Sequence, residues 1–228
     1  MISGANRGIG RAIAGTLHGK GYTVSVGARD PAALESVLSP LAGERLLCAR
    51  YEASDHASHA AWLSATQAKF GRLDALVNNA GTSNTFSIEE GHEADLDALW
   101  TTNIKGPLFF IRICLPHLKA CGSGRIVNVA SLSGKRVRND NVAYNMTKHA
   151  MMALTHGTRR ICWEHGVRVT ALCPSFVATD LPAGVTKVMR GEMIEPADLA
   201  ELAATAIALP NTAAMAEMLV NCRLEDTL

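Results

Sequence analysis

Ser131, Tyr144 and Lys148 lie close together in the sequence and carry a hydroxyl, a phenol and an ammonium group. Because Tyr144 and Lys148 are four residues apart, a helix would place both on one face, about one turn from each other. A phenol titrates near pH ~10 and a cation beside it favours the phenolate, so we predict that Lys148 lowers the pKa of Tyr144. Ser131 follows the apolar run 124–130, a predicted buried strand, where a hydroxyl could polarise a carbonyl group. The stretch therefore predicts proton transfer at a substrate oxygen.

The same spacing has a plainer explanation. A tyrosine and a lysine four residues apart, met alone, form a surface pair about ten times as often as a catalytic one. A serine after a strand adds little by itself. The rest of the sequence is therefore needed to choose between a catalytic site and a solvated surface pair.

A glycine-rich turn, Ser-Gly-Ala-Asn-Arg-Gly-Ile-Gly, occupies residues 3–10 and precedes a predicted helix whose apolar residues recur every four positions. Backbone N–H groups and the positive end of a helix can bind a phosphate there, and glycine lets a pyrophosphate approach closely. The predicted strand 22–27 follows, which favours dinucleotide binding over an ordinary tight turn. Only Met1 and Ile2 precede the turn, so we expect either an unusually short first strand or a trimmed chain start.

The second predicted strand ends at Ala28 and Arg29. In a dinucleotide-binding fold, an acidic side chain at this point binds the ribose diol and selects NAD. Ala28 cannot do so, whereas Arg29 and Arg7 could hold a 2′-phosphate through paired N–H donors. We therefore predict NADP(H), with NAD(H) possible if the two arginines are only solvated surface charges.

Predicted strands and helices alternate along the chain, with no proline- or serine-rich linker and no repeat. The strands are expected at 22–27, 46–52, 73–78, 124–130, 167–173 and 216–222, and the main helices at 97–121, 142–164 and 196–209. This alternation is typical of a doubly wound parallel sheet. A length of 228 residues suits one such α/β domain, covering residues 1–228.

Composition narrows the class of protein. The 22 basic and 21 acidic residues nearly balance and form no basic run, which argues against a nucleic-acid surface. No segment has the roughly 18 apolar residues that span a membrane, and the first residues do not resemble a signal peptide. The six cysteines lack the spacing of a metal site. We expect a cytoplasmic protein with free thiols and no metal.

Five separated segments resemble, in order and spacing, the motifs of the short-chain dehydrogenase/reductase family over essentially the whole chain. They are the turn 3–10, the Asn-Asn-Ala-Gly turn 78–81, Asn103 in the predicted helix 97–121, Ser131, and the pair Tyr144 and Lys148. The resemblance implies a single Rossmann-type domain with about seven parallel strands flanked by helices on both faces. It also implies that Tyr144 is the general acid or base, Ser131 holds the substrate oxygen, and Lys148 binds the nicotinamide ribose. Asn103 would hold a water that relays protons.

The resemblance also places the cofactor contacts. On the phosphates and the adenosine side they are Gly4, Ala5, Asn6, Arg7, Gly8, Ile9, Gly10, Arg29, Glu52 and Ala53. Beside the ribose and the nicotinamide they are Asn79, Ala80, Gly81, Tyr144, Lys148, Pro174, Val177 and Thr179. The chain departs from the family pattern at Ser3, Glu52 and Ser175, where Thr, Asp and Gly are usual. Of these, Ser175 is expected to stiffen the backbone beside the nicotinamide.

These residues predict an oxidoreductase that transfers a hydride between NADP(H) and a small-molecule carbonyl or secondary alcohol. The alternative is a non-catalytic protein that binds NADP(H) and reports redox state to a partner. The intact set of four predicted catalytic residues argues against a sensor, which has no need of all four. A sugar-nucleotide epimerase is disfavoured, because nothing after the final predicted strand could form a substrate domain.

The substrate contacts are expected between and beyond the catalytic residues. Ser133, Asn141 and Leu181 are the candidates, and the polar residues that precede Tyr144 favour a polar or anionic substrate unless they form only a solvated loop. The stretch 180–195 could cover the substrate or be a plain surface helix.

The predicted helices 97–121 and 142–164 are expected to build a homodimer or homotetramer. Their apolar residues that could point outward are Leu108, Phe109, Phe110, Ile113, Met151, Met152 and Ile161. The alternative, that these side chains belong to the core, explains about half of them.

Overall fold

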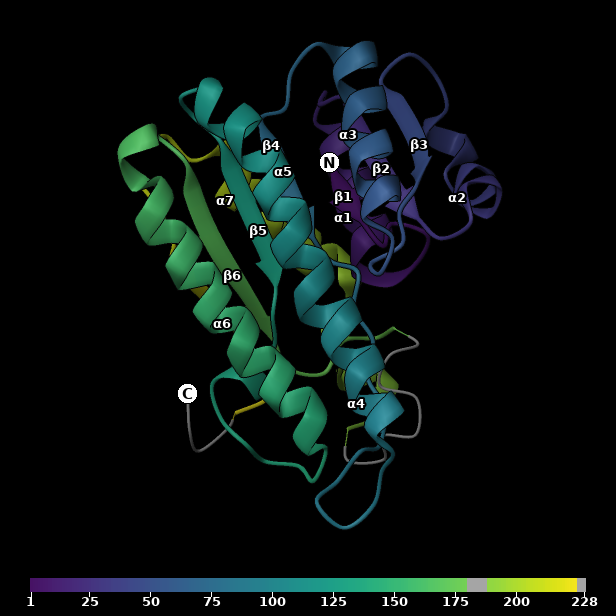
Figure 1. The fold of residues 1–228 in the computed structure, drawn as a ribbon, viewed down its shortest axis with the longest axis vertical. Helices are drawn as coiled ribbons and strands as arrows, with labels where there is room; N and C mark the ends of the chain where they lie inside the picture. The colour runs from purple at the N-terminus through teal and green to yellow at the C-terminus, as the bar shows by residue number, and fades with distance from the viewer. Residues whose placement is uncertain (180–187, 225–228) are drawn as a thin grey trace.

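The protein, seen in a computed structural model that describes residues 1–179 and 188–224, is built around one parallel sheet (Figure 1). Its strands are β1 (Ile2–Ser3), β2 (Val24–Ala28), β3 (Leu46–Arg50), β4 (Ala75–Asn78), β5 (Arg125–Val129), β6 (Arg168–Pro174) and β7 (Glu217–Val220). Within the described residues they pair in the order β3-β2-β1-β4-β5-β6-β7, and each pair is parallel. The prediction of about seven parallel strands is confirmed.

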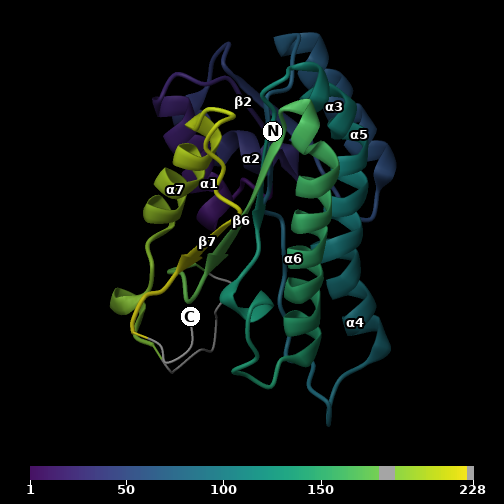
Figure 2. The same cartoon turned by 90° about the vertical axis from the view of Figure 1, so that its left-hand side faces the viewer.

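Helices cover both faces of this sheet (Figure 2). On one face lie α1 (Gly8–Gly19), α2 (Pro31–Val37) and α7 (Pro196–Ala208), and on the other lie α3 (His56–Phe70), α5 (Gly106–Ala120) and α6 (Val142–Cys162). Helix α4 (Glu93–Trp100) leads into α5. Short 3-10 turns occur at Ser39–Leu41, Leu132–Gly134, Trp163–His165 and Arg190–Glu192. The double winding places buried apolar residues between the sheet and each helical layer.

Strand β1 is short but central. Ile2 pairs with Val26 of β2 on one side and with Val77 of β4 on the other. The amide of Val77 donates to Met1 O at 2.8 Å, and the Met1 amine donates to Ala75 O at 2.6 Å. The expectation of an unusually short first strand agrees with the structure, because pairing on both sides holds even two residues in the sheet.

The larger side chains of the core stack between β3, α3 and α5. Trp62 and Phe110 are almost completely buried, with ring centroids 4.9 Å apart and nearly parallel planes. Tyr51 packs against both rings. Gly27 of β2 makes room for this cluster, because a Cβ there would lie 2.7 Å from the Trp62 ring. The cluster therefore holds β2 and β3 against α3 and α5.

The predicted helix 97–121 is longer and less regular than expected. Helix α4 begins at Glu93, and a π-helical turn, Thr101–Lys105, joins it to α5. A π-helical turn shifts the register of the helix and is frequent at functional sites. Asn103 lies within this turn. The irregularity therefore falls where the sequence places a functional residue.

Several side chains expected to point outward belong to the core. Phe110, Met151 and Met152 are buried, so for these three the alternative, that they belong to the core, is the one the structure supports. Their positions face the sheet because the apolar stripes of α5 and α6 are used to cover it. Leu108 and Ile161 are exposed, 42% and 66% of their surface being accessible, and Phe109 and Ile113 are half-buried.

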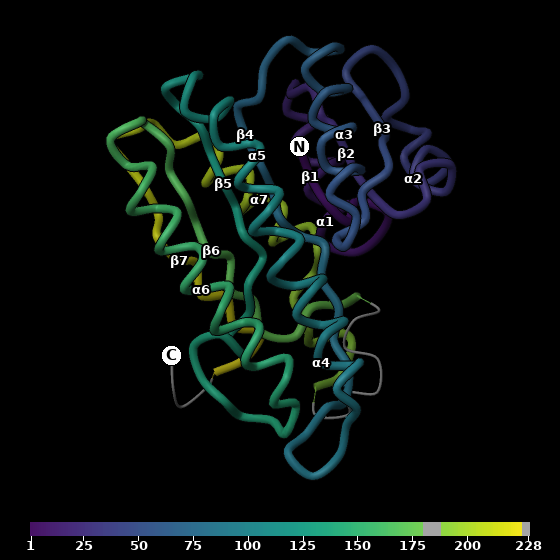
Figure 3. The backbone as a smooth tube through the Cα atoms, in the orientation of Figure 1, coloured from purple at the N-terminus to yellow at the C-terminus, as the bar shows by residue number. Residues whose placement is uncertain are grey.

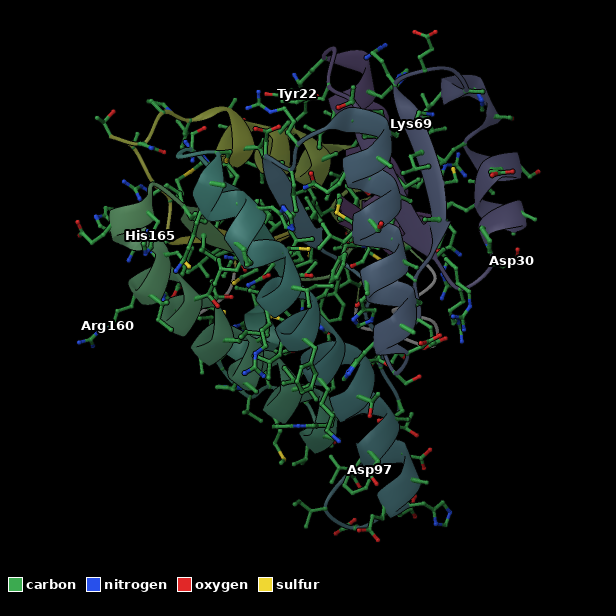
Figure 4. All side chains as sticks on the ribbon, turned by 45° about the horizontal axis from the view of Figure 1, so that its top comes forward. Tyr22, Asp30, Lys69, Asp97, Arg160 and His165 are labelled. Atoms are coloured by element: carbon green, nitrogen blue, oxygen red, sulfur yellow. The ribbon has the colours of Figure 1, made fainter. Side chains whose placement is uncertain are left out.

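The carboxyl ends of the strands meet at one edge of the sheet, the lower edge in Figure 1. The backbone trace shows the segment between β4 and α4 and the segment that leads into α6 reaching this same end of the molecule (Figure 3). Charged side chains such as Asp30, Lys69, Asp97 and Arg160 project from the periphery (Figure 4). The lower edge of the sheet is therefore where loops from distant parts of the chain can form a site.

Candidate active site

The glycine-rich turn between β1 and α1 packs so closely against the end of β4 that side chains would not fit at Gly4 or Gly10. Gly4 and Gly8 have φ angles of 68° and 52°, in the left-handed region that favours glycine. A Cβ on Gly4 would lie 2.8 Å from Ala80 Cα, and one on Gly10 would lie 2.4 Å from Asn79 Nδ2. The N-cap residue of α1 makes no side-chain hydrogen bond to the first N–H groups of the helix. The turn and these N–H groups fit the pyrophosphate of a dinucleotide.

Asn79 and Ser3 fasten this turn to the end of β4. Asn79 Nδ2 donates to Ser3 O and to Gly4 O, each at 3.0 Å. Ser3 Oγ accepts from the backbone N–H groups of Asn79 and Ala80, each at 3.1 Å. The hydroxyl that Ser3 shares with threonine is therefore used. The Asn79 side chain, predicted to lie beside a ribose, also fixes the shape of the glycine turn.

Strand β2 ends at Ala28 and is followed by Arg29 and Asp30. Ala28 is buried and Arg29 is exposed. The next residue, Asp30, is acidic, but its carboxylate caps α2 by accepting from two backbone N–H groups at 3.0 and 3.1 Å. Helix α2, which the sequence analysis did not predict, begins with this cap and a proline. Arg29 and Arg7 are both exposed.

Glu52 and Ala53 follow β3. The Glu52 carbonyl oxygen accepts from His59 Nε2 at 2.8 Å, and its backbone N–H donates to Ser58 Oγ at 3.1 Å. The first turn of α3 therefore fixes the Glu52 backbone. Ala53 is buried, and a Cβ on Gly106 would lie 2.8 Å from its methyl group.

Ser131 follows β5 and begins a 3-10 turn. Its Oγ accepts from Ser133 N at 3.1 Å and donates to Pro174 O at 3.5 Å. The Ser131 hydroxyl also lies close enough to the phenol of Tyr144 to act on its pKa. The turn thus directs the hydroxyl toward both α6 (Val142–Cys162) and the end of β6.

Tyr144 and Lys148 lie one turn apart on α6, as predicted. Lys148 Nζ is 5.4 Å from the centroid of the Tyr144 ring. The ammonium is buried and donates to Val129 O at 3.0 Å. Ser131, Tyr144 and Lys148 are therefore brought together at the carboxyl end of β5.

The electrostatics of this cluster differ from the prediction. Burial raises the pKa of Tyr144 to about 12, although the hydrogen bond with Ser131 acts to lower it. Burial also lowers the pKa of Lys148 to about 8. The predicted net fall in the pKa of Tyr144 is not found in this structure, because desolvation of the phenolate dominates. The phenol is therefore protonated at neutral pH.

Asn103 is buried beside the same cluster. Its Oδ1 accepts from Thr82 N and its Nδ2 donates to Thr82 O, both at 2.9 Å. A Cβ on Gly81 would lie 3.4 Å from Asn103 Oδ1 and 4.0 Å from Lys148 Nζ. Gly81 therefore lies beside both the Asn103 amide and the Lys148 ammonium.

The segment after β6 meets the glycine turn. A Cβ on Gly8 would lie 3.0 Å from Thr179 Cγ2. Val177 is buried and forms an isolated bridge with Ile194. Ser175 Oγ accepts from Cys222 N at 2.9 Å, so the serine that replaces the usual glycine ties this segment to the residues after β7.

The three predicted substrate contacts lie in different settings. Ser133 is half-buried in the turn that follows Ser131. Asn141 caps α6, with Oδ1 accepting from Tyr144 N at 3.1 Å. Leu181 lies outside the described residues.

Two threonines that the sequence analysis passed over complete the hydrogen bonding. Thr147 Oγ1 accepts from Asn103 Nδ2 at 3.1 Å and donates to Tyr144 O at 2.9 Å. Thr82 supplies the backbone groups that hold the Asn103 amide. A threonine one position before Lys148 on a predicted helix is a weak signal, because threonine often bonds back to its own helix.

Within residues 1–179 and 188–224, no helix is both long enough and apolar enough to cross a membrane. The same residues contain no cluster of three or more His, Cys, Asp or Glu side chains that could hold a metal ion.

A family model described as short chain dehydrogenase matches residues 1–189. The chain belongs to the short-chain dehydrogenase family, whose members are nucleotide-binding oxidoreductases with the Rossmann fold. The resemblance inferred from the motifs is therefore confirmed.

Among relatives, the chain is 43% identical to an agropine synthesis reductase of Rhizobium rhizogenes over 227 residues, which are 99% of this chain and 53% of the relative. The chain thus spans about half the length of that protein. It is also 34% identical to an uncharacterized oxidoreductase of Staphylococcus saprophyticus over 92% of this chain and 91% of the relative.

Two solved structures are similar over nearly the whole chain. A 3-ketoacyl-(acyl-carrier-protein) reductase from Brucella melitensis, complexed with NADH, has a TM-score of 0.90 and 29% identity, covering 97% of this chain and 95% of its own. A metagenomic short-chain oxidoreductase in complex with NADP has a TM-score of 0.83 and 30% identity, covering 98% and 96%.

Proposed function

We propose that the protein is an NADP(H)-dependent reductase of carbonyl compounds in which Tyr144 is the general acid. The observation that supports this most directly is the convergence of the Tyr144 phenol, the Ser131 hydroxyl and the Lys148 ammonium at the carboxyl end of β5. Ligands of open α/β sheets bind at this edge, and the glycine-rich turn begins there too. A proton donor and a phosphate-binding turn therefore share one edge of the sheet.

The side chains have complementary tasks in this proposal. The reduced nicotinamide, when bound, supplies the hydride. Ser131 and Tyr144 hydrogen-bond the carbonyl oxygen of the substrate and polarise it. As negative charge develops on that oxygen, the phenol of Tyr144 donates its proton, and the Lys148 ammonium stabilises the phenolate that remains. In the oxidation direction the phenolate accepts a proton from the alcohol.

The protonation state of Tyr144 is the one that reduction requires. Because burial raises the pKa of Tyr144 to about 12, its phenol carries a proton at neutral pH. A general acid has to begin the reaction in this form. The reverse reaction would need the phenolate and is therefore expected to be favoured by high pH.

The preference for NADP(H) rests on the charges at the end of β2. Arg29 is exposed next to Ala28, and the neighbouring Asp30 carboxylate is engaged in capping α2. A 2′-phosphate would gain the Arg29 guanidinium, while one oxygen of the Asp30 carboxylate is turned toward the N–H groups of α2. The similar structures bind NADH in one case and NADP in the other, so the charges of this chain decide the preference.

The names of the relatives are consistent with reduction of a small molecule. The relative from Rhizobium rhizogenes is an agropine synthesis reductase, and one similar structure is a ketoacyl reductase. Because this chain spans about half of the former, we propose only the shared chemistry, which is reduction of a carbonyl group or its equivalent.

The test is oxidation of NADPH and NADH, followed by absorbance, with a panel of aldehydes, ketones and keto acids. We expect turnover with at least one class and a lower KM for NADPH than for NADH. Tight cofactor binding without turnover over the whole panel would contradict the enzymatic proposal and favour a redox sensor. Equal KM values for the two cofactors would contradict the role of Arg29.

A further inference from the structure

The side-chain amide of Asn141 joins two parts of the candidate site. Its Oδ1 accepts from Tyr144 N at 3.1 Å and so caps the first turn of α6. Its Nδ2 donates to Ser83 Oγ at 3.1 Å and to the carbonyl oxygen of Asn84. An amide can accept and donate at once, whereas an ionised carboxylate of the same shape can only accept. The residue therefore connects the backbone of Tyr144 to the segment after β4.

That segment, Thr82–Asn84, directly follows Gly81, which lies next to Asn103 Oδ1 and Lys148 Nζ. Asn103 holds its first residue by the paired hydrogen bonds to the Thr82 backbone. Asn141 holds its last two residues. The segment is therefore fixed at both ends by buried or half-buried amides.

Asn84 extends the connection toward the rest of the loop. Its Nδ2 donates to Asp95 O in α4 at 3.1 Å, and its Oδ1 accepts from Phe86 N at 3.2 Å. Asn84 therefore connects Phe86 to Asn141, because it accepts from Phe86 N through its side chain and from Asn141 Nδ2 through its carbonyl oxygen. A displacement at Asn141 would move the wall of the site relative to the phenol of Tyr144.

We propose that Asn141 is a positioning residue that sets the distance between Tyr144 and the loop 82–86, and so determines how tightly the carbonyl substrate is bound. The proposal rests on the function proposed above, and it replaces the expectation that Asn141 contacts the substrate. Asn141 acts through the loop and the helix, and the proton is still donated by Tyr144.

The test compares two substitutions. Asn141→Ser keeps a side-chain oxygen that can cap α6 at Tyr144 N, but it is too short to reach Ser83 and Asn84. Asn141→Ala removes both connections. We expect Asn141→Ser to unfold at a somewhat lower temperature than the wild type, because two hydrogen bonds within the folded chain are lost, and to bind NADPH as the wild type does. Its KM for the carbonyl substrate should rise about tenfold, as expected for the loss of two hydrogen bonds, with kcat changed less. Asn141→Ala should show the same rise in KM and unfold at a still lower temperature.

Asn139→Ala is the matched control. Asn139 Oδ1 accepts from Asn141 N at 3.0 Å and from Asn145 Nδ2 at 3.1 Å, so it belongs to the same loop without touching residues 82–84. Its KM should stay within twofold of wild type. A wild-type KM in Asn141→Ser, or an equal rise in Asn139→Ala, would overturn the positioning role.

Hydrogen–deuterium exchange separates this inference from the proposed function. We expect Asn141→Ser to increase exchange at residues 82–86 while α6 stays protected. If no substrate is turned over, the proposed function fails but the exchange result still tests the connection. Unchanged exchange at residues 82–86 would refute it.

Discussion

The burial of Lys148 predicts a gain of stability when its charge is removed. Burial lowers the pKa of this ammonium from 10.5 to about 8. At 1.36 kcal/mol per pKa unit, keeping the group charged in the folded protein at pH 7 costs about 3 kcal/mol. Lys148→Met has a similar length and no charge, but it loses the hydrogen bond to Val129 O, worth about 1 kcal/mol. The variant should therefore be about 2 kcal/mol more stable than the wild type at pH 7, while losing turnover.

The pH dependence has a definite sign. Since the folded state binds the Lys148 proton less tightly than the unfolded state, the stability of the wild type should rise as the pH rises from about 8 towards 10.5. Lys148→Met lacks this rise. The advantage of the variant should therefore be greatest below pH 8 and shrink above it.

Urea unfolding of the protein without cofactor, at pH 7 and at pH 9.5, measures both effects. Lys69→Met is the control, because Lys69 also donates to a strand carbonyl, Leu46 O at 2.7 Å, but is exposed. It should gain no stability. If Lys148→Met were less stable than the wild type at pH 7, the argument from desolvation would be refuted.

Two further substitutions test the glycine-rich turn and the ionic contacts of Glu217 in β7. Gly10→Ala should abolish cofactor binding in a titration of NADPH fluorescence, because the new Cβ would lie 2.4 Å from both Asn79 Nδ2 and a backbone oxygen of the glycine turn. Retained binding would contradict the claim that this turn binds the pyrophosphate. Partial burial acts to raise the pKa of Glu217, but hydrogen bonds from Lys135 and His156 outweigh it and leave the pKa below its ordinary value. Glu217→Gln should therefore lose about 1 kcal/mol at pH 7, and the loss should vanish as the pH falls through the pKa of the folded wild type and the carboxylate is protonated. A loss that is independent of pH in thermal unfolding would contradict this.

The fold could be predicted because its signals are local. The apolar runs at β5 and β6 and the glycine turn are each contained in a few consecutive residues, and their alternation defines a doubly wound sheet. The π-helical turn Thr101–Lys105 could not be predicted, because its register shift depends on what Asn103 contacts after folding. The inward direction of Phe110 was likewise set by packing against α3.

The sequence predicted which residues make up the candidate site, but not their hydrogen bonds or their pKa shifts. The spacing in the sequence correctly predicts that Lys148 lies near Tyr144. It does not give the desolvation that raises the pKa of Tyr144, because burial depends on residues from several elements. Asn79 and Asn141 have partners up to 76 and 58 positions away, so their structural roles are visible only in the folded chain.

The measurement that tests the central claim most directly is the kcat of Tyr144→Phe with NADPH and the best carbonyl substrate from the panel, alongside the Kd for NADPH. The account predicts that kcat falls by at least about 10²-fold while the Kd for NADPH stays within about threefold of wild type, because only the proton donor is removed. A kcat within a few-fold of wild type would show that Tyr144 does not donate the proton.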